Sequence, residues 1–179
     1  MTGFVRTNDD GERYIEAGGV TESGGGMVEP LGVANRAIGG GDWRYRAGTG
    51  EGQRGLKDCF GLNNIGLLVK AWGRVTASGT DPRAGISWFY LDDGSGVRDG
   101  TGVLGVYCEG VFGITPPQAG SYARVVGISG CEYYKGSLVN VIRVSGQEDI
   151  SAVFTVPTSL MRAAASTADS RPRDASKLK

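Results

Sequence analysis

Apolar and polar residues alternate over several short segments in the second half of the chain. A period of two residues is typical of a β-strand with one buried face. Polar stretches rich in glycine, proline and aspartate separate these segments, as expected of turns. The pattern predicts strands over residues 65–77, 86–93, 103–110, 121–130 and 137–144. Short strands in this number predict an all-β protein with a small closed five-stranded barrel.

The first predicted strand, IGLLVKAWGRVTA, is long and carries Gly73 in its interior. A glycine tolerates a bulge or sharp bend that other residues resist, so we expect this strand to bend there and to serve two sheets. Alternation then selects one face of the first three strands for the barrel interior. The residues expected to point inward are Leu67, Val69, Ala71, Phe89, Leu91, Leu104 and Val106.

The regions around the predicted barrel, residues 62–156, differ in character. Residues 1–22 are predicted to form a hairpin and share a plan with residues 127–150: a glycine, a short strand, a polar turn with glycine and a second strand. We interpret them as the closing hairpin of a preceding, similar repeat, and the chain as a fragment of a longer protein. Residues 23–61 form a lead-in with a short helix predicted over 31–38, and the polar tail 157–179 is predicted to be disordered.

Composition and charge exclude several classes of function. Lysine plus arginine equals aspartate plus glutamate at 19 each, so no global positive field is available to hold a polyanion. The chain contains no histidine, which removes the Ser/His/Asp triad and most catalytic zinc sites. Adjacent acids such as Asp92 and Asp93 point to opposite faces of a strand, so they make a poor acid/base pair. The sequence therefore predicts a protein that is not an enzyme and has no metal and no cofactor.

The cysteines Cys59, Cys108 and Cys131 share no CxxC spacing, and their odd number permits at most one disulfide. Buried or free thiols are favoured over a bridge between Cys108 and Cys131. The first 25 residues lack the basic start and apolar run of a signal peptide, and no segment has the length and apolarity of a membrane span. The chain as written is expected to be soluble, and extracellular if it is a fragment of a secreted protein.

The segments GLLVKAWGRVT, WFYLDDGSGV, GVYCEG, GSYARVVGISG and LVNVIRVSGQEDI, in this order, resemble the oligonucleotide/oligosaccharide-binding (OB) fold found in bacterial multi-domain proteins. The resemblance covers residues 62–150 and extends to the lead-in VEPLGVANRAIGG. It implies a five-stranded Greek-key barrel of OB type. The helix usual between the third and fourth strands of that fold is missing here.

The acidic segment LDDGSGV is interpreted as the connection from the second strand to the third, because its glycines supply the positive φ angles of a tight turn. A calcium loop needs acids at alternate positions and a distal glutamate, whereas Asp92 and Asp93 are adjacent and the next acid is Asp99. A phosphate loop would need further glycines or a Gly-Lys-Ser sequence.

The predicted outer face mixes aromatic and basic side chains, as surfaces that bind single-stranded nucleic acid or sugars do. In the OB fold, the loops after the first and fourth strands flank the ligand. The candidate ligand-binding residues are therefore Lys70, Trp72, Arg74, Arg83, Trp88, Tyr90, Tyr107, Tyr133, Tyr134 and Lys135. The alternative for the rings is that residues 23–60 cover them.

Two functions remain open. The first is a non-catalytic module that binds single-stranded nucleic acid, such as single-stranded DNA, across the face of Trp88 and Tyr90. The second is a structural, adhesive or carbohydrate-binding repeat of a larger secreted or surface protein, whose partners are an oligosaccharide or neighbouring OB-like repeats. The glycine-rich, charge-balanced composition favours the second. Neither function involves a membrane.

Overall fold

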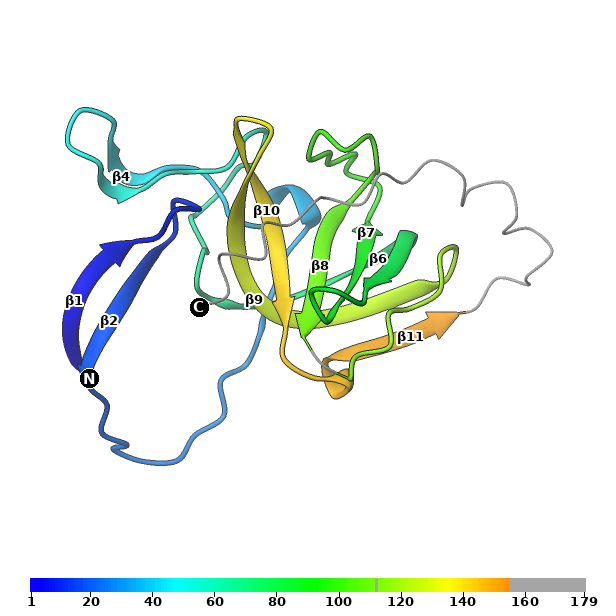
Figure 1. Ribbon diagram of the computed structural model, residues 1–179, viewed down its shortest axis with the longest axis horizontal. Helices are drawn as coiled ribbons and strands as arrows, with labels where there is room; N and C mark the ends of the chain where they lie inside the picture. The colour runs from blue at the N-terminus through cyan, green and yellow to red at the C-terminus, as the bar shows by residue number, and fades with distance from the viewer. Residues whose placement is uncertain (112, 155–179) are drawn as a thin grey trace.

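The computed structural model describes residues 1–111 and 113–154 and is all-β (Figure 1). The expected tail, residues 157–179, lies outside the described residues. The strands are β1 Thr2–Thr7, β2 Arg13–Gly19, β3 Leu31–Gly32, β4 Trp43–Arg46, β5 Glu51–Gln53, β6 Leu68–Asp81, β7 Ile86–Asp92, β8 Val106–Val111, β9 Tyr122–Tyr134, β10 Ser137–Val144 and β11 Ile150–Phe154. Two short 3₁₀ helices, η1 Asn35–Ala37 and η2 Gln147–Asp149, complete the elements of the described part.

The five strands predicted from the sequence form a closed ring within one sheet. The hydrogen-bonded order is β6–β7–β8–β10–β9, and β9 pairs again with β6 to close it. Strands β8 and β10 run parallel, and the other neighbours in the ring are antiparallel. β3 adds to the edge of β6, and β11 adds to β9. The all-β class and the closed ring are confirmed.

Strand β6 changes partner next to Gly73, where the sequence predicted a bend. It pairs with β9 from Leu68 to Arg74 and with β7 from Arg74 to Asp81, with a register shift between Val75 and Ala77. A Cβ on Gly73 would lie 2.4 Å from the backbone oxygen of Asp92. The glycine is therefore needed because the chain leaving β7 passes directly over it.

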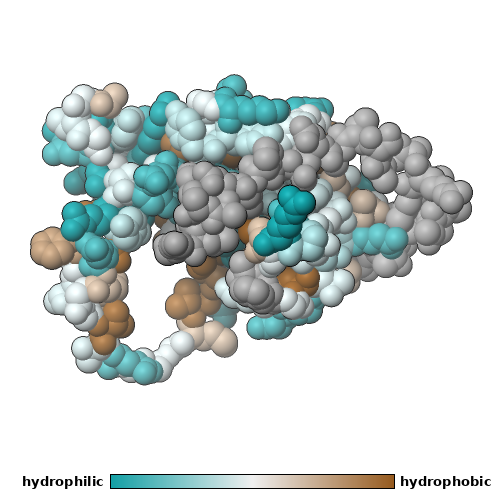
Figure 2. Space-filling model, in the orientation of Figure 1, coloured by the Kyte–Doolittle hydropathy of each residue, from teal (hydrophilic) through white to brown (hydrophobic). Residues whose placement is uncertain are grey.

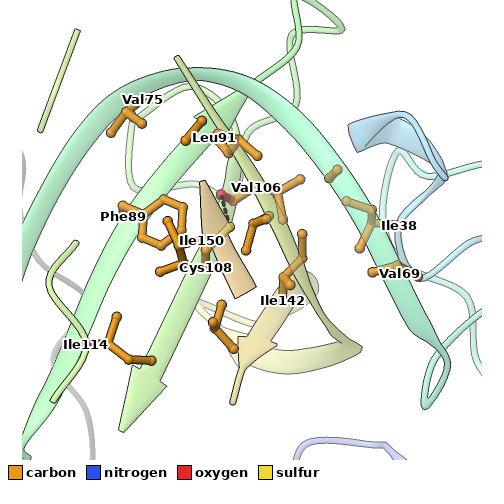
Figure 3. Close-up of a cluster of buried hydrophobic side chains, with 14 residues drawn as sticks. Ile38, Val69, Val75, Phe89, Leu91, Val106, Cys108, Ile114, Ile142 and Ile150 are labelled. Atoms are coloured by element: carbon orange, nitrogen blue, oxygen red, sulfur yellow. Dashed lines mark hydrogen bonds between the residues drawn. The ribbon is translucent and has the colours of Figure 1, made fainter. Parts of the chain in front are cut away.

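The ring encloses a core of branched aliphatic side chains around Phe89 (Figure 3). Val69, Ala71, Phe89, Leu91 and Val106 are all at most 1% exposed, as expected for inward-facing positions. Ile38, next to η1, and Ile114, after β8, lie on opposite sides of this cluster in Figure 3.

Two residues of the expected interior do not belong to the core. Leu67 precedes β6 and is 51% exposed, so its predicted inward position is wrong. Leu104 lies in the loop before β8 and is half-buried. Both stand outside the strands of the ring, where the two-residue alternation no longer holds.

Other elements also differ from the sequence prediction, among them the unpredicted strands β4 and β5. The helix expected over 31–38 is reduced to the two-residue strand β3 and the 3₁₀ helix η1. β9 runs through CEYY, so the turn before β10 is only Lys135–Gly136, whose φ angles of 45° and 80° fit a type I′ hairpin. β11 was not predicted, because a five-residue segment beside a polar turn gives little alternation to read.

The amino-terminal hairpin β1–β2 contacts the rest of the protein through its turn. In Figure 1 its strands point away from the ring, and the turn end approaches β9 and β10. Glu12 Oε1 accepts hydrogen bonds from the Cys131 N–H and from Arg143 Nη1, both at 2.6 Å. The same guanidinium lies 3.6 Å from Glu109. A side chain at Gly130 would collide with this pair, since its Cβ would lie 2.4 Å from Glu12 Oε1.

We expect Gly73→Ala to lower the free energy of unfolding by about 1–3 kcal/mol, because its methyl group meets backbone rather than a movable side chain. Urea unfolding followed by far-UV circular dichroism measures the loss. Gly32→Ala is the control, since a Cβ there meets nothing within 4 Å. Equal stability of the two variants would show that β6 has room to shift at its bend.

We expect Glu12→Ala to cost about 1.5–3 kcal/mol, because it removes an acceptor that serves one charged and one backbone donor at a site only 15% exposed. The matched control is Glu16→Ala, which breaks the Arg6–Glu16 pair whose side chains are 56% and 55% exposed and should cost about 0–1 kcal/mol. Urea unfolding gives the stabilities, and limited trypsin digestion reports hairpin release. Similar losses in both variants would contradict a specific role for the Glu12 contact.

Candidate functional site

The outer surface of β6 and β9 brings exposed rings and cations together, and we call it the β6/β9 face: Lys70, Trp72, Arg74, Tyr122 and Arg124. The antiparallel register sets Trp72 opposite Arg124 and Arg74 opposite Tyr122. Directly opposed residues project from the same side of a sheet, so rings and guanidinium groups alternate across the two strands. Trp72 is 62% exposed and Tyr122 is 41% exposed.

The cations of the β6/β9 face form no ion pair with the part of the chain that the structure describes. Within the described residues, no carboxylate oxygen lies within 4.0 Å of the charged nitrogens of Lys70, Arg74 or Arg124. Arg124 Nη2 donates to Ser151 Oγ of β11 at 3.1 Å, which restrains its direction without neutralising it. The face can therefore offer π surfaces and positive charge to the same ligand.

The rings of Trp88, Tyr90 and Tyr107 form a separate cluster on β7 and β8. Ring centroids are 6.1 Å apart for Trp88–Tyr90, 6.4 Å for Trp88–Tyr107 and 5.3 Å for Tyr90–Tyr107. Tyr90 and Tyr107 are each 3% exposed, and Trp88 is half-buried. The expectation that all three rings face water is wrong for the two tyrosines.

The loop between β7 and β8 contributes to the burial of these rings. Its Asp99 accepts a hydrogen bond from the Tyr90 hydroxyl at 2.6 Å, and its Val103 packs against the cluster. On the other side, a Cβ on Gly79 would lie 2.7 Å from the Trp88 ring, so β6 approaches the indole closely. The loop contact explains the burial of Tyr90, which strand alternation alone cannot reveal.

The end of β9 and the turn that follows it hold three further predicted residues. Tyr133 is half exposed, whereas Tyr134 is only 8% exposed. Lys135 Nζ lies 5.1 Å from the centroid of the Tyr134 ring, in range for a cation–π contact. Tyr134 and Lys135 line a hollow of about 150 Å³ together with Lys57 and Arg98, which sequence reasoning did not select.

Arg83 lies apart from these groups, in the turn between β6 and β7. Its backbone N–H and that of Ala84 donate to Asp81 Oδ1 at 2.9 and 3.2 Å, which fixes the turn. The side chain is exposed. Arg83 therefore remains a candidate on position only.

The acidic segment that follows β7 anchors the lead-in. Asp93 accepts hydrogen bonds from the Asn35 N–H at 2.8 Å and from the Ser95 N–H at 2.9 Å, and Asp92 accepts one from the Gly94 N–H at 3.1 Å. Partial burial alone would raise the pKa of Asp93, but the hydrogen bonds that its carboxylate accepts outweigh burial and lower the pKa. The tight hairpin expected here is instead a longer loop, closed by a bridge between Arg98 and Leu104.

The described residues include the three cysteines and most of the acidic side chains of the chain. They contain no cluster of three or more His, Cys, Asp or Glu side chains able to hold a metal ion. The three cysteines are free thiols in the structure. Burial raises the pKa of Cys59 to about 11, with the nearby Asp58 adding to the rise and Arg36 opposing it. Burial also raises the pKa of Cys131 to about 12 and that of Cys108 further still.

A second hollow, of about 480 Å³, lies between the hairpins and the start of β6. Trp43, Val5 and Leu67 supply its apolar wall. Its Gln53 amide is already engaged, accepting from the Arg13 N–H and donating to Gly11 and Arg54 carbonyls. This hollow was not predicted, because it depends on how the hairpins lie against the ring.

Tyr122 and Arg124 are the residues of the β6/β9 face that sequence reasoning did not select. Both lie on the outward side of the SYARVV segment, as alternation predicts. The pairing of β9 with β6 is what makes them neighbours of Trp72 and Arg74. A closed five-strand order, imposed on the predicted strands, would have identified them.

No protein-family model matches the sequence, and no curated protein shows significant similarity to it. No helix in the described part of the chain is long and apolar enough to cross a membrane.

We expect the stability contribution of Asp93 to depend on pH. Because its pKa is lowered in the folded state, the contribution is complete above the pKa of an unfolded aspartate, about 3.9, and is lost as the pH falls through the lower folded value. The difference in melting temperature between the wild type and Asp93→Asn should therefore be present at neutral pH and vanish in strong acid. Thermal unfolding from pH 7 to pH 2 measures it, with Asp9→Asn as the control for charge removal. A difference that stays constant over this range would exclude the carboxylate charge as its source.

Proposed function

We propose that this chain is a non-catalytic binding module, built on a Greek-key barrel of OB type, that binds single-stranded nucleic acid on the β6/β9 face. Support for the barrel type comes from the strand order. The third and fifth ring strands, β8 and β10, are the parallel pair, and the fourth, β9, closes onto the first, β6. This connectivity agrees with the sequence resemblance to that fold.

The observation that carries the ligand class is the alternation of Trp72 and Tyr122 with Arg74 and Arg124 on adjacent strands. Exposed rings accept stacked bases of any sequence, and guanidinium groups accept phosphate oxygens. Each of the two strands carries one ring and one guanidinium group, two residues apart. Lys70 adds a further positive charge at the β3 end of β6.

The proposed binding face differs from the one expected from the sequence. Tyr90 and Tyr107 are covered, so the exposed stacking surface moves from β7 and β8 to β6 and β9. Of the candidate residues, Lys70, Trp72 and Arg74 remain in the proposed site. Arg83 and Tyr133 are exposed and Trp88 is half-buried, but they are not part of the proposed site.

The second candidate function is a structural, adhesive or carbohydrate-binding repeat. The hairpin β1–β2 favours it, because Phe4 and Val5 are 73% and 63% exposed and Tyr14 and Ile15 are nearly half exposed. Figure 2 shows apolar side chains over this part of the molecule. An isolated ribbon with apolar residues on both faces is the kind of surface that a neighbouring repeat would cover.

We expect Trp72→Ala to weaken binding of a fluorescein-labelled dT12 oligonucleotide. One lost base stack costs about 1–3 kcal/mol, which is roughly a 5- to 150-fold weaker affinity. Fluorescence anisotropy at low salt measures it. The matched control is Trp43→Ala, which removes a ring that is 58% exposed but lies on β4.

Replacing Arg74 by alanine should lower the slope of log affinity against log salt by about 0.7 for a lost phosphate contact.

The same titration separates the two functions. No anisotropy change with the folded wild-type protein at low salt would reject nucleic-acid binding and favour the repeat. Equal weakening by Trp72→Ala and Trp43→Ala would show that binding does not use the β6/β9 face.

A further inference from the structure

A small basic hollow lies between three segments that are distant in the chain, and we call it the basic pocket. Lys57 comes from the lead-in, Arg98 from the loop between β7 and β8, and Lys135 from the β9–β10 turn. Like charges repel, so bringing cations to one hollow costs free energy unless an anion compensates. Within the described residues no carboxylate oxygen lies within 4.0 Å of their charged nitrogens.

The carboxylate in the wall of the basic pocket, Asp99, is engaged elsewhere. It is 4% exposed and accepts hydrogen bonds from the Tyr90 hydroxyl at 2.6 Å and from the Thr101 N–H at 2.9 Å. The Thr101 hydroxyl donates to it as well, at 2.5 Å. Asp99 thereby holds the loop in place, and the positive charge of the pocket stays in excess.

Neighbouring contacts restrain two of the three cations. Arg98 Nη1 donates to the Gly102 carbonyl at 2.9 Å, and Lys135 lies against the Tyr134 ring in a turn of positive φ. The buried Asn140 lines the same hollow and donates to the Asn35 carbonyl at 3.4 Å. Arg98 and Lys135 are thus restrained by neighbouring groups, and all three cations are exposed to solvent.

The volume restricts what the basic pocket can hold. At about 150 Å³ it is well below the roughly 300–1,000 Å³ of sites that enclose whole small-molecule ligands. It has room for one compact group. An arginine fork with two ammonium groups suits a tetrahedral oxyanion, whose oxygens spread in several directions.

We propose that the basic pocket binds a single phosphate group. The site is separate from the β6/β9 face and does not rest on nucleic-acid binding there. The phosphate can belong to a free or terminal phosphate or to a phosphodiester within a strand, since both present the same oxygens.

Inorganic phosphate tests the proposal, titrated at constant ionic strength into the ¹⁵N-labelled chain and followed by amide chemical shifts. We expect saturable shifts confined to residues 57, 98–100 and 134–140. Arg98→Gln and Lys57→Gln should each weaken the affinity at least tenfold, and the second variant leaves the Gly102 contact intact. Arg83→Gln is the control, because it removes an exposed cation outside the pocket.

A second arm identifies the source of the phosphate. Unphosphorylated dT6 that competes with phosphate for the pocket indicates a phosphodiester, whereas competition by 5′-phosphorylated dT6 alone indicates a terminal or free phosphate. Shifts that do not saturate, or that Arg83→Gln weakens as much as Lys57→Gln does, would overturn the proposal. Because Trp72→Ala leaves every pocket residue in place, failure of one site is distinguishable from failure of the other.

Discussion

The pairing of β9 with β6 is the constraint on which the remaining architecture depends. It joins Leu68–Arg74 to Tyr122–Ile128 and turns an open sheet into a ring. Without it, β6 and β9 would each present a free edge, and the apolar residues between them would face water. The pairing requires β6 to be shared, and Gly73 permits the sharing because the backbone of Asp92 passes where a side chain would stand. The pairing of β9 with β6 thus both closes the ring and brings together the residues of the β6/β9 face.

The sequence predicted the ring strands and the inward face well, because both follow from an alternation that a barrel imposes on every strand. Phe89 and Leu91 are buried where alternation placed them. The same rule was wrong for Tyr90 and Tyr107, since it separates the two faces of a strand but does not say whether a loop covers the outer one. Here the loop between β7 and β8 folds back and bonds to Tyr90.

The candidate sites also consist of a part that the sequence predicts and a part that only the fold reveals. Trp72 and its basic neighbours on β6 could be named from one strand, whereas Tyr122 and Arg124 needed knowledge of which strand lies beside it. The basic pocket is harder still to predict from the sequence. Lys57, Arg98 and Lys135 stand in segments with no common pattern, and the fold alone makes them neighbours.

The contact of Glu12 with β9 and β10 has a consequence for the order of assembly. Its partners Cys131 and Arg143 are 119 and 131 residues further along the chain. Contacts of such long range form late, because the intervening chain must first be organised. The hairpin precedes the ring strands in the chain but is among the last segments to reach its final position. Until the last ring strand is in place, the carboxylate that anchors it stays in water.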